Sequence, residues 1–437
     1  MKLMMKATAA AALVGSVAVS TTAHASGFEK SIVLGGRSAG VAGIATPYIQ
    51  GADALYFNPA GLVADKAGNS LSFNISPTSP TFKGPINNAN DISQTDSKTV
   101  FPASIMFNHT MNEQWGFGAG VFVSGGAQAT YTGISYPNST YQPEVKTDLQ
   151  IFEASAGVGY KATDKLKLGL AWRVVMAQAD FSFLARASAT SAANAKLTGL
   201  KDTQAAAIRM GAQYKIDDAT SLGLTFRSEV NFSANGRAQV TGFSSAGGGG
   251  AAGTEQDATA RTTFPMAITL GGLHKLNDDW NLLGEWAWTQ YSRVGEIVVD
   301  STAFSTTGNQ TRLKTDWRDQ HNIRIAAEYN TPWPVRFGYI YTSSVTNTDY
   351  ARASFAPPAP AHTLTVGTGK GFATSEGAEQ NLHFDAGLEY TWSSGDGGAS
   401  AATAGVTTPS ASYDINARSG TYSVTAYAAH LGLTYMF

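Results

Sequence analysis

The sequence predicts an all-β fold: a fourteen-stranded antiparallel transmembrane β-barrel that holds an N-terminal hatch in its lumen. Three observations predict it: an export signal, a low content of charged residues, and alternation of apolar and polar residues from residue 69 onward. Only 14% of the residues are charged, against about 25% in ordinary soluble domains. Low charge without long apolar runs is typical of a membrane barrel, because its apolar and polar residues alternate.

Residues 1–25 predict a secretory signal peptide. Lys2 and Lys6 form a short basic region, residues 7–19 are small and apolar, and residues 23–25 fit the small-x-small cleavage pattern. The apolar run is too short to stay as a membrane anchor, which needs about 20 residues. Cleavage takes the formal net charge from −2 to −4, because two lysines are lost. This near-balance argues against nucleic acid as a partner, and a chain without cysteine has no disulfides.

Period-2 alternation predicts fourteen strands, and we expect the barrel to span residues 69–437. The first strand shows the pattern with Leu71, Phe73 and Ile75 on one face. The expected ranges are 69–76, 101–109, 115–124, 148–160, 165–179, 205–215, 220–228, 264–275, 280–291, 321–330, 335–342, 362–370, 381–391 and 422–437.

The connections alternate between short and long. Tight connections rich in turn residues are expected at 111–114, 162–164, 216–218, 276–279 and 331–334, with a moderate one at 371–378. The others are predicted to be long polar loops, for example 77–99, 180–204 and 229–262. Short periplasmic turns and long external loops are the pattern of an outer-membrane barrel. A soluble β-sandwich, the alternative, does not usually alternate its loops so regularly.

The chain end and the aromatic residues fit this barrel. The last strand places Leu431, Leu433, Tyr435 and Phe437 on one face, as suits a lipid-facing strand that closes the barrel. Aromatic pairs stand at strand ends, where interfacial girdles are expected: Trp115/Phe117, Trp286/Trp288 and Tyr339/Tyr341.

Residues 26–68 precede the first strand and predict a compact hatch inside the lumen. The segment is rich in Gly and Ala, which let a backbone pack closely against a wall. Pro59 holds Asn58 extended and stops any helix begun at Asp53. The Asn58 side chain is expected to bond backbone groups, and Gly61 to permit a positive φ just beyond. Seen alone, this Asn-Pro-Ala-Gly stretch fits an ordinary turn equally well.

In this order the features resemble the FadL/TodX family of outer-membrane transporters for hydrophobic compounds. A signal peptide is followed by SAGVAG at 38–43, Asp-Ala at 53–54, Asn-Pro-Ala-Gly at 58–61, and strands that end in Phe437. The stretches FPASIMFNHTMNEQWGFGAGVFV and YKATDKLKLGLAWRVVMAQADFSF are also similar. The resemblance covers nearly all of the chain after the signal peptide. The long loops do not match residue by residue, so the choice of substrate stays open.

The resemblance implies uptake of long-chain fatty acids or, alternatively, of aromatic or alkane hydrocarbons. In that family the ligand docks in an apolar groove between two extracellular loops and then enters a tighter lumenal site beside the hatch N-terminus. Movement of that N-terminus releases the ligand through a side opening, at a kink in the third strand, into the membrane. The residues implied to start the mature hatch and reach the tight site are Ser26, Gly27 and Phe28. Those implied to anchor the hatch are Asn58, Pro59, Ala60 and Gly61.

The third strand has a candidate for such a kink. It alternates cleanly from Trp115 to Val123 and then meets Gly125 and Gly126. Paired glycines break the ladder and favour a kink or bulge, and a kink opens the gap that a lateral exit requires. The alternative is that the two glycines only begin the second loop.

Two of the expected loops carry apolar residues, which are costly when exposed unless they bury each other or bind something apolar. The candidates for the docking groove are Phe181, Phe183, Leu184, Leu197 and Leu200 in one loop and Phe232, Val240 and Phe243 in the other. Mutual packing of these residues is the alternative. An apolar site needs no charged anchor, because burial of each methylene contributes about 0.8 kcal/mol.

A carboxylate cargo would favour a cation in the lumen. Four arginines are expected to face inward, because they lie opposite the apolar strand positions: Arg173, Arg209, Arg324 and Arg336. They fit equally well a bracing role, in ion pairs with Glu153, Glu285 or Glu328. An aromatic hydrocarbon would need none of them.

The competing functions are an enzyme, a general porin, and an adhesin or structural barrel. The histidines are scattered and no residue pair has nucleophile–base spacing, so we expect no enzymatic activity, no catalytic residues, no metal and no cofactor. A porin has no use for a hatch, whereas the long loops leave room for an adhesin. We expect a monomer in the bacterial outer membrane, where lipid, lipopolysaccharide and the barrel-assembly machinery are its partners beside the hydrophobic cargo.

Overall fold

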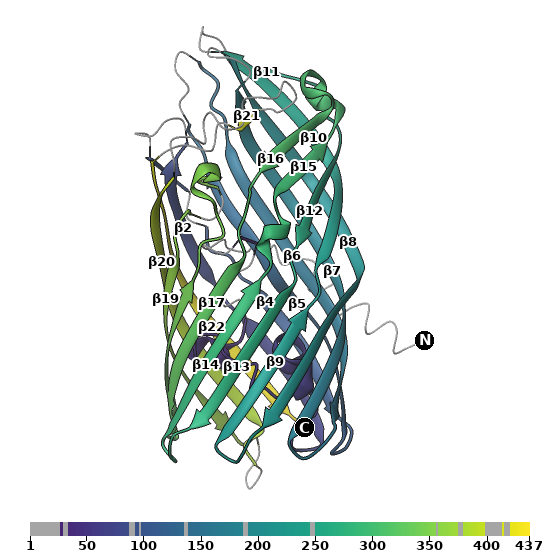
Figure 1. Cartoon of the computed structure of the whole chain (residues 1–437), viewed down its shortest axis with the longest axis vertical. Coiled ribbons are helices and arrows are strands. Elements are labelled where there is room, and N and C mark those ends of the chain that lie inside the picture. Colours follow the sequence, from purple (N-terminus) through teal and green to yellow (C-terminus); the bar gives the residue numbers. More distant parts are fainter. Residues whose placement is uncertain are drawn as a thin grey trace.

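The wall of the protein is one antiparallel sheet of twenty-two strands, shown as a computed structural model in Figure 1. The structure describes residues 27–28, 34–86, 92–95, 98–134, 139–186, 191–244, 250–354, 357–374, 379–397, 413–414 and 420–437. The predicted signal peptide lies outside these residues. The strands are β1 (Gly68–Ile75), β2 (Thr78–Pro85), β3 (Ile92–Gln94), β4 (Ala103–Thr110), β5 (Trp115–Tyr131), β6 (Val145–Lys161), β7 (Leu166–Arg186), β8 (Ser191–Lys215), β9 (Thr220–Arg227), β10 (Val230–Ser244), β11 (Ala251–Ala252), β12 (Gln256–Phe264), β13 (Ala267–Lys275), β14 (Trp280–Thr289), β15 (Glu296–Asp300), β16 (Gln310–Lys314), β17 (Gln320–Tyr329), β18 (Val335–Thr342), β19 (Ala361–Phe372), β20 (Leu382–Gly397), β21 (Tyr413–Asp414) and β22 (Gly420–Met436).

The sheet closes on itself as a ring of fourteen strands. Hydrogen-bonded neighbours run in the order β1, β4, β5, β6, β7, β8, β9, β13, β14, β17, β18, β19, β20 and β22, and β22 pairs with β1 again. The strands β2, β10, β12, β15 and β16 continue five of these passes beyond short breaks in the chain. The predicted fourteen-stranded antiparallel barrel is therefore confirmed.

The two ends of the barrel differ in their connections. The short turns and the C-terminus lie at one end, which we call periplasmic (Figure 1). At the extracellular end, the segments expected to be long loops at 77–99, 180–204 and 229–262 are largely strand, in β2, β7, β8, β10 and β12. The loop prediction is wrong there because the wall continues beyond the lipid. Residues such as Ala, Ser and Thr then give little contrast between its faces.

The two halves of the barrel have opposite polarity. In the periplasmic half, Ile323 and Ile325 of β17 point outward and are 51% and 58% exposed, whereas Asn322 is buried. In the extracellular half, Phe232 of β10 is buried and the neighbouring Asn231 is exposed. The periplasmic half therefore suits lipid outside and polar groups inside. The extracellular half suits water outside and an apolar interior.

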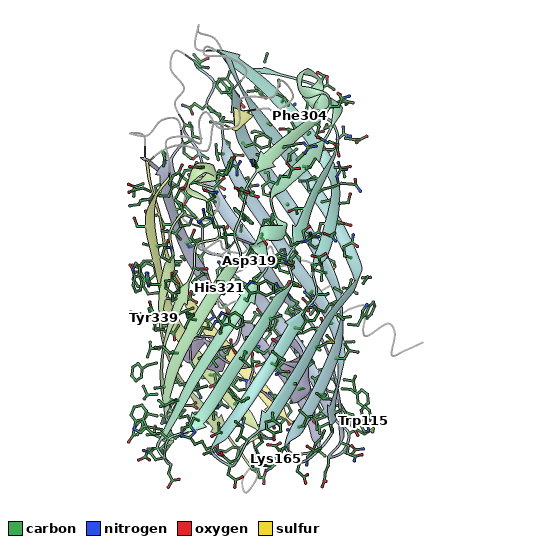
Figure 2. All side chains as sticks on the ribbon, viewed as in Figure 1. Trp115, Lys165, Phe304, Asp319, His321 and Tyr339 are labelled. Carbon is green, nitrogen blue, oxygen red and sulfur yellow. The ribbon has the colours of Figure 1, made fainter. Side chains whose placement is uncertain are left out.

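Aromatic side chains mark two levels on the outer surface. Trp115 lies near the periplasmic end, and His321 and Tyr339 lie about half-way along the barrel (Figure 2). At that second level, the Trp286 ring stacks on His321 with centroids 5.9 Å apart, and Tyr339 stacks on His362 at 6.1 Å. Trp and Tyr favour both membrane interfaces, so the wall between these levels faces lipid. Among the described residues, no helix has the length and apolarity to cross a membrane.

The described part of the hatch, residues 34–67, lies inside the ring. It holds the helices α2 (Gly36–Gly40) and α3 (Ala54–Phe57) and the 3-10 helix η1 (Pro59–Leu62), drawn in purple within the periplasmic half in Figure 1. Helix α2 packs against β18, β19, β20 and β22, whereas η1 packs against β4, β5, β6, β7 and β8. A segment that contacts such distant parts of a closed wall fills its interior.

Inward-facing glycines of the wall make room for the hatch. An added Cβ would lie within 3.2 Å of a hatch atom at Gly116, Gly118, Gly157, Gly159, Gly169, Gly211, Gly223, Gly271, Gly338, Gly367, Gly387 and Gly432. At Gly211 it would lie 1.9 Å from Asn58 Oδ1, and at Gly169 it would lie 2.1 Å from the carbonyl carbon of Pro59. Any side chain would collide there, so the hatch packs directly against the backbone of the wall.

We expect the substitution Gly211→Ala to displace the hatch, because overpacking of a tight contact costs about 1–3 kcal/mol. Ion conductance of the purified variant in planar bilayers should rise above that of the wild type. The matched control is Gly284→Ala, where an added Cβ meets nothing closer than the Arg324 carbonyl oxygen at 4.0 Å. Equal conductance of the two variants would contradict the close contact.

Candidate functional site

Asn58 joins the hatch to the wall. The residue is extended, at φ −154°, as its place before Pro59 requires. Its Oδ1 accepts a hydrogen bond from Ala60 N at 3.1 Å. Its Nδ2 donates to Thr46 O within the hatch at 2.8 Å and to Ala212 O of β8 at 3.0 Å. Because the side chain is fully buried, all three bonds form away from water, and one amide ties two hatch turns to one strand.

The neighbours of Asn58 serve close packing. Helix α3 ends at Phe57, as expected from Pro59. The positive φ expected around Gly61 is wrong for Gly61 itself, which lies within η1 and is not among the glycines of positive φ. An added Cβ there would lie 2.0 Å from Ile49 O. The motif therefore needs this glycine for space and not for a left-handed backbone.

The four inward arginines are held by carboxylates. Each of these pairs is 2.9 Å apart or less: Arg173–Glu153, Arg209–Glu153, Arg324–Glu285 and Arg336–Glu328. Three of the pairs also hold the hatch. Arg209 donates to Leu55 O at 3.0 Å, Glu285 accepts from Thr46 N at 3.3 Å, and Glu328 forms an ion pair with Arg37 of α2 at 3.7 Å. Of the two roles that the sequence allowed, the geometry is that of bracing.

Asp53 connects the hatch to β1. Its carboxylate accepts hydrogen bonds from Asn74 Nδ2 at 3.1 Å and from the Ser72 hydroxyl. Burial raises the pKa of Asp53 above its ordinary value, and the two hydrogen bonds act in the opposite direction. The contact adds a polar attachment on a side of the ring that Asn58 does not reach.

An apolar cavity lies in the extracellular half of the lumen. Its walls are almost wholly carbon, and its empty volume, including the opening, is about 510 Å³. Phe28 and six strands line it, with the residues Leu149, Ile151, Ala177, Ala179, Phe181, Leu200, Phe232, Ala234, Ala260, Thr262, Phe264 and Ile297. Such a dry, shaped space suits an apolar small molecule.

Phe28 reaches this cavity from the start of the hatch. Its amide N–H donates to the Tyr291 hydroxyl at 3.1 Å, and its carbonyl oxygen accepts from Gly126 N at 2.8 Å. Gly27 has φ +31°, and an added Cβ there would lie 2.4 Å from the Tyr291 ring. Ser26 lies outside the described residues. The structure thus brings Phe28 to the cavity and Gly27 to the Tyr291 ring, and their role toward a ligand stays a prediction.

Strand β5 is irregular beside Phe28. Its pairing with β6 shifts register between Val123 and Gly125, and Gly126 has φ 152°. Pairing with β4 covers 116–122 of β5, so among the described residues the rest of β5 has a ladder partner only in β6. Both faces of β5 are buried beyond the shift, and a register shift of this kind is typical of a bulge. Its use as an exit stays a prediction.

The apolar residues expected in two docking loops lie on strands and inside the barrel. Phe181 of β7, Leu200 of β8 and Phe232 of β10 line the cavity. The others belong to the buried apolar cluster around it, or pack against that cluster: Phe183, Leu184, Leu197, Val240 and Phe243. Their expected location in exposed loops is wrong, because β7, β8 and β10 extend through the segments expected to be loops. Contact with a ligand stays a prediction for each of them.

Several cavity residues escaped sequence reasoning. Leu149 and Ile151 were placed in a strand, without a lumenal role, yet they face inward and are 7% and 2% exposed. The signal that identifies them is a switch in which face of β6 carries the apolar residues. Apolar residues alternate inward up to Ile151, and the next inward residue is Glu153, which is buried and charged. Tyr291 and Trp317 gave no signal, because they lie in short breaks between strands.

Arg227 stands where the cavity meets a polar chamber. Its guanidinium carbon lies 4.5 Å from the ring centroid of Phe264, which lines the cavity, and its Nη2 donates to Pro265 O at 3.1 Å. The chamber has an empty volume of about 900 Å³, and its lining includes Arg227, Arg209 and Ser124 of β5. A cation therefore borders the apolar cavity on the side of the hatch.

A wide, charged chamber opens below the hatch at the periplasmic end. Its empty volume is about 2130 Å³. The charged residues that line it are Arg37, Asp53, Asp65, Lys161, Asp164, Lys165, Lys167, Lys215, Asp217, Asp218, Lys275 and Asp385. Figure 2 shows Lys165 at this rim. An apolar molecule gains nothing from such a lining.

One buried set of side chains has the residue types of a hydrolase but not its access. His430 Nδ1 lies 2.8 Å from the Ser76 hydroxyl, and His430 Nε2 lies 3.0 Å from Glu389. The three residues are 0%, 1% and 5% exposed. A substrate therefore has no route to the hydroxyl.

Comparisons with known proteins agree with this geometry. The family model described as outer membrane protein transport protein (OMPP1/FadL/TodX) matches residues 16–437. The long-chain fatty acid transport protein of Escherichia coli is 22% identical over 69% of this chain and 73% of its own length. The chain spans only part of the length of its curated relatives. The matched share of the relative is 33% for a putative outer membrane protein of Neisseria meningitidis and 73% for the E. coli protein.

Solved structures share the fold. A Pseudomonas aeruginosa FadL homologue superposes with a TM-score of 0.74 at 15% identity, over 94% of this chain and 99% of that one. The P. putida toluene transporter TodX superposes with a TM-score of 0.72 at 18% identity, over 93% of this chain and 99% of that one. With a family model that spans the barrel and the hatch together, this chain belongs to the OMPP1/FadL/TodX family of bacterial outer-membrane transport proteins.

Proposed function

We propose that the protein takes up hydrophobic compounds across the outer membrane, with long-chain fatty acids as the first candidate cargo. The observation that carries the proposal is the dry cavity above the hatch, which Phe28 helps to line and which adjoins the register shift in β5. Burial of an acyl chain there contributes about 0.8 kcal/mol for each methylene. The cavity needs no other source of affinity for an apolar cargo.

The cargo enters from the extracellular end. The residues expected in docking loops form the apolar interior of that half, so they receive the cargo inside the barrel. Phe181, Leu200 and Phe232 lead to the cavity as part of its lining. Entry of a ligand larger than the empty space displaces the Phe28 ring, because this ring is part of the cavity wall.

The cargo leaves sideways through the wall. Downward movement is blocked by the hatch and then meets the charged periplasmic chamber. Beyond Gly125, β5 has lost its pairing with β4, and this gap lies beside Phe28. A lateral exit delivers an apolar molecule directly to lipid, so it never crosses an aqueous layer.

Arg227 favours a cargo with a carboxylate. It lies at the edge of the apolar cavity, where an acyl chain inside the cavity would place its head group. The alternative cargo is an aromatic or alkane hydrocarbon, which the almost wholly apolar lining favours. The toluene transporter of P. putida shares the fold, and the long-chain fatty acid transport protein of E. coli is one of the relatives by sequence.

Deletion of residues 26–62 tests the transport function. In a host that lacks its own fatty-acid porin, the wild-type chain should support growth on oleate or on toluene as sole carbon source. The deletion variant should lose this growth or admit polar solutes, because it lacks both Phe28, which lines the cavity, and the hatch, which closes the lumen. An adhesin or structural barrel predicts no change in either measurement, and that result would contradict the proposal.

The substitution Arg227→Gln tests the cargo class. If Arg227 binds a carboxylate, loss of a charge-assisted hydrogen bond worth about 1.5–3 kcal/mol weakens oleate binding roughly 10- to 100-fold. Toluene binding should stay unchanged. The matched control is Arg293→Gln, an arginine 54% exposed at its side chain and paired with Glu229 at 3.3 Å. Equal loss of both cargoes in the Arg227 variant would contradict a carboxylate contact.

A further inference from the structure

The hairpin of β15 and β16 is rooted in an aromatic pair inside the barrel. The 3-10 helix η2 (Tyr291–Arg293) leads into β15, and Trp317 follows β16. The rings of Tyr291 and Trp317 meet edge to face with centroids 5.7 Å apart, and both side chains are buried. The two ends of one extracellular hairpin therefore meet at a single point in the lumen.

The backbone around this pair is fixed by hydrogen bonds. The amides of Thr315 and Asp316 both donate to Gly295 O at 2.9 Å, which ties the exit of the hairpin to its entry. Arg318 N donates to Val345 O at 2.8 Å, so the exit is also tied to the next connection along the wall. The aromatic pair is thus held in place independently of the hatch.

Both residues of the pair contact Phe28. The Trp317 ring meets the Phe28 ring edge to face at 5.0 Å between centroids, and the Tyr291 ring lies 6.4 Å away. The Tyr291 hydroxyl accepts the Phe28 amide hydrogen at 3.1 Å. One residue of the hatch is therefore bound through its ring and its backbone to the roots of the hairpin.

The same residue bridges the lumen to β5. The Phe28 carbonyl oxygen accepts from Gly126 N at 2.8 Å, and Gly126 lies just past the register shift of that strand. The Phe28 ring also lines the apolar cavity, whereas Tyr291 and Trp317 are not part of its lining. Displacement of the ring by a ligand strains both backbone bonds of Phe28, of which one holds β5.

We propose that Tyr291 and Trp317 form a latch on Phe28 that sets how readily the hatch N-terminus leaves the cavity and releases Gly126. Both are positioning residues, because they act on the ligand through Phe28. The proposal rests on the proposed function, of which it names the regulation. The latch also connects the cavity to an extracellular hairpin, so movement of that hairpin changes the hold on Phe28.

The latch has an energetic signature opposite to that of a ligand contact. A ligand that displaces Phe28 binds only molecules with an open latch, so the measured affinity is the intrinsic affinity reduced by the fraction of such molecules. Tyr291→Phe removes one hydroxyl and keeps the ring. Loss of a hydrogen bond of ordinary strength should raise that fraction and tighten binding about two- to tenfold. Loss of a direct ligand contact would weaken binding.

Hydrogen exchange without any ligand tests the latch directly. We expect the β5 peptide that contains Gly126 to exchange faster in Tyr291→Phe and in Trp317→Leu than in the wild type. The matched control is Tyr422→Phe, a buried tyrosine whose hydroxyl donates to Ala351 O at 3.3 Å. Unchanged exchange in Tyr291→Phe, or an equal rise in Tyr422→Phe, would overturn the latch. If the Trp317→Leu variant does not assemble into a barrel, the exchange rate of Tyr291→Phe alone tests the latch.

Equilibrium binding of tritiated oleate and of radiolabelled toluene completes the test. Tighter binding of either compound to Tyr291→Phe, at unchanged binding to Tyr422→Phe, supports a latch that competes with the ligand. Unchanged or weaker binding overturns it. A wild-type protein that binds neither compound overturns the proposed function, and the ligand-free exchange result then still judges the grip on Phe28 by itself.

Discussion

Direct packing of the hatch against the backbone of the wall is the constraint on which the structure depends. Glycine occupies the inward positions of ten wall strands beside the hatch, and a methyl group at Gly116 would lie 1.9 Å from Leu62 O. The close approach lets side chains bond backbone groups across the contact: Asn58 of the hatch donates to Ala212 O of the wall, and Arg209 of the wall donates to Leu55 O of the hatch. The hatch is therefore shaped by the wall, and a free hatch would have no reason to fold.

The opposite polarity of the two barrel halves explains how the hatch limits the movement of an apolar molecule. The periplasmic half has lipid outside and a polar lumen, which the bracing ion pairs such as Arg173–Glu153 and the hatch fill. The extracellular half has water outside and a dry lumen, in which Phe28 sits. An apolar molecule that arrives from outside thus meets favourable surface only as far as the hatch. Beside Phe28, at the end of this apolar path, the pairing of β5 with β6 shifts register.

Sequence reasoning recovered the ring and the hatch because both depend on local patterns. Lipid on one face enforces alternation at positions such as Leu168 and Leu170, and Pro59 fixes the chain beside Asn58 whatever surrounds it. The loops and the cavity were not recoverable in this way. Strand ends beyond the lipid lose the alternation that marks them, so Phe181 and Phe232 were assigned to loops. Tyr291 and Trp317 contact Phe28 across more than 260 residues of sequence, and no local sequence pattern predicts such a contact.

The central claim is that the body of the hatch stays lodged in the wall while only its N-terminus moves. The chain has no cysteine, and an ideal Cβ at Gly51 of the hatch lies 3.7 Å from the Ser70 Cβ of β1, within the range of a disulfide. Mass spectrometry of the oxidised Gly51→Cys/Ser70→Cys variant in intact membranes, with uptake measured on the same cells, is the most direct measurement. The account predicts a linked peptide and undiminished uptake. Absence of the link, or uptake that stops on oxidation and returns on reduction, would contradict it.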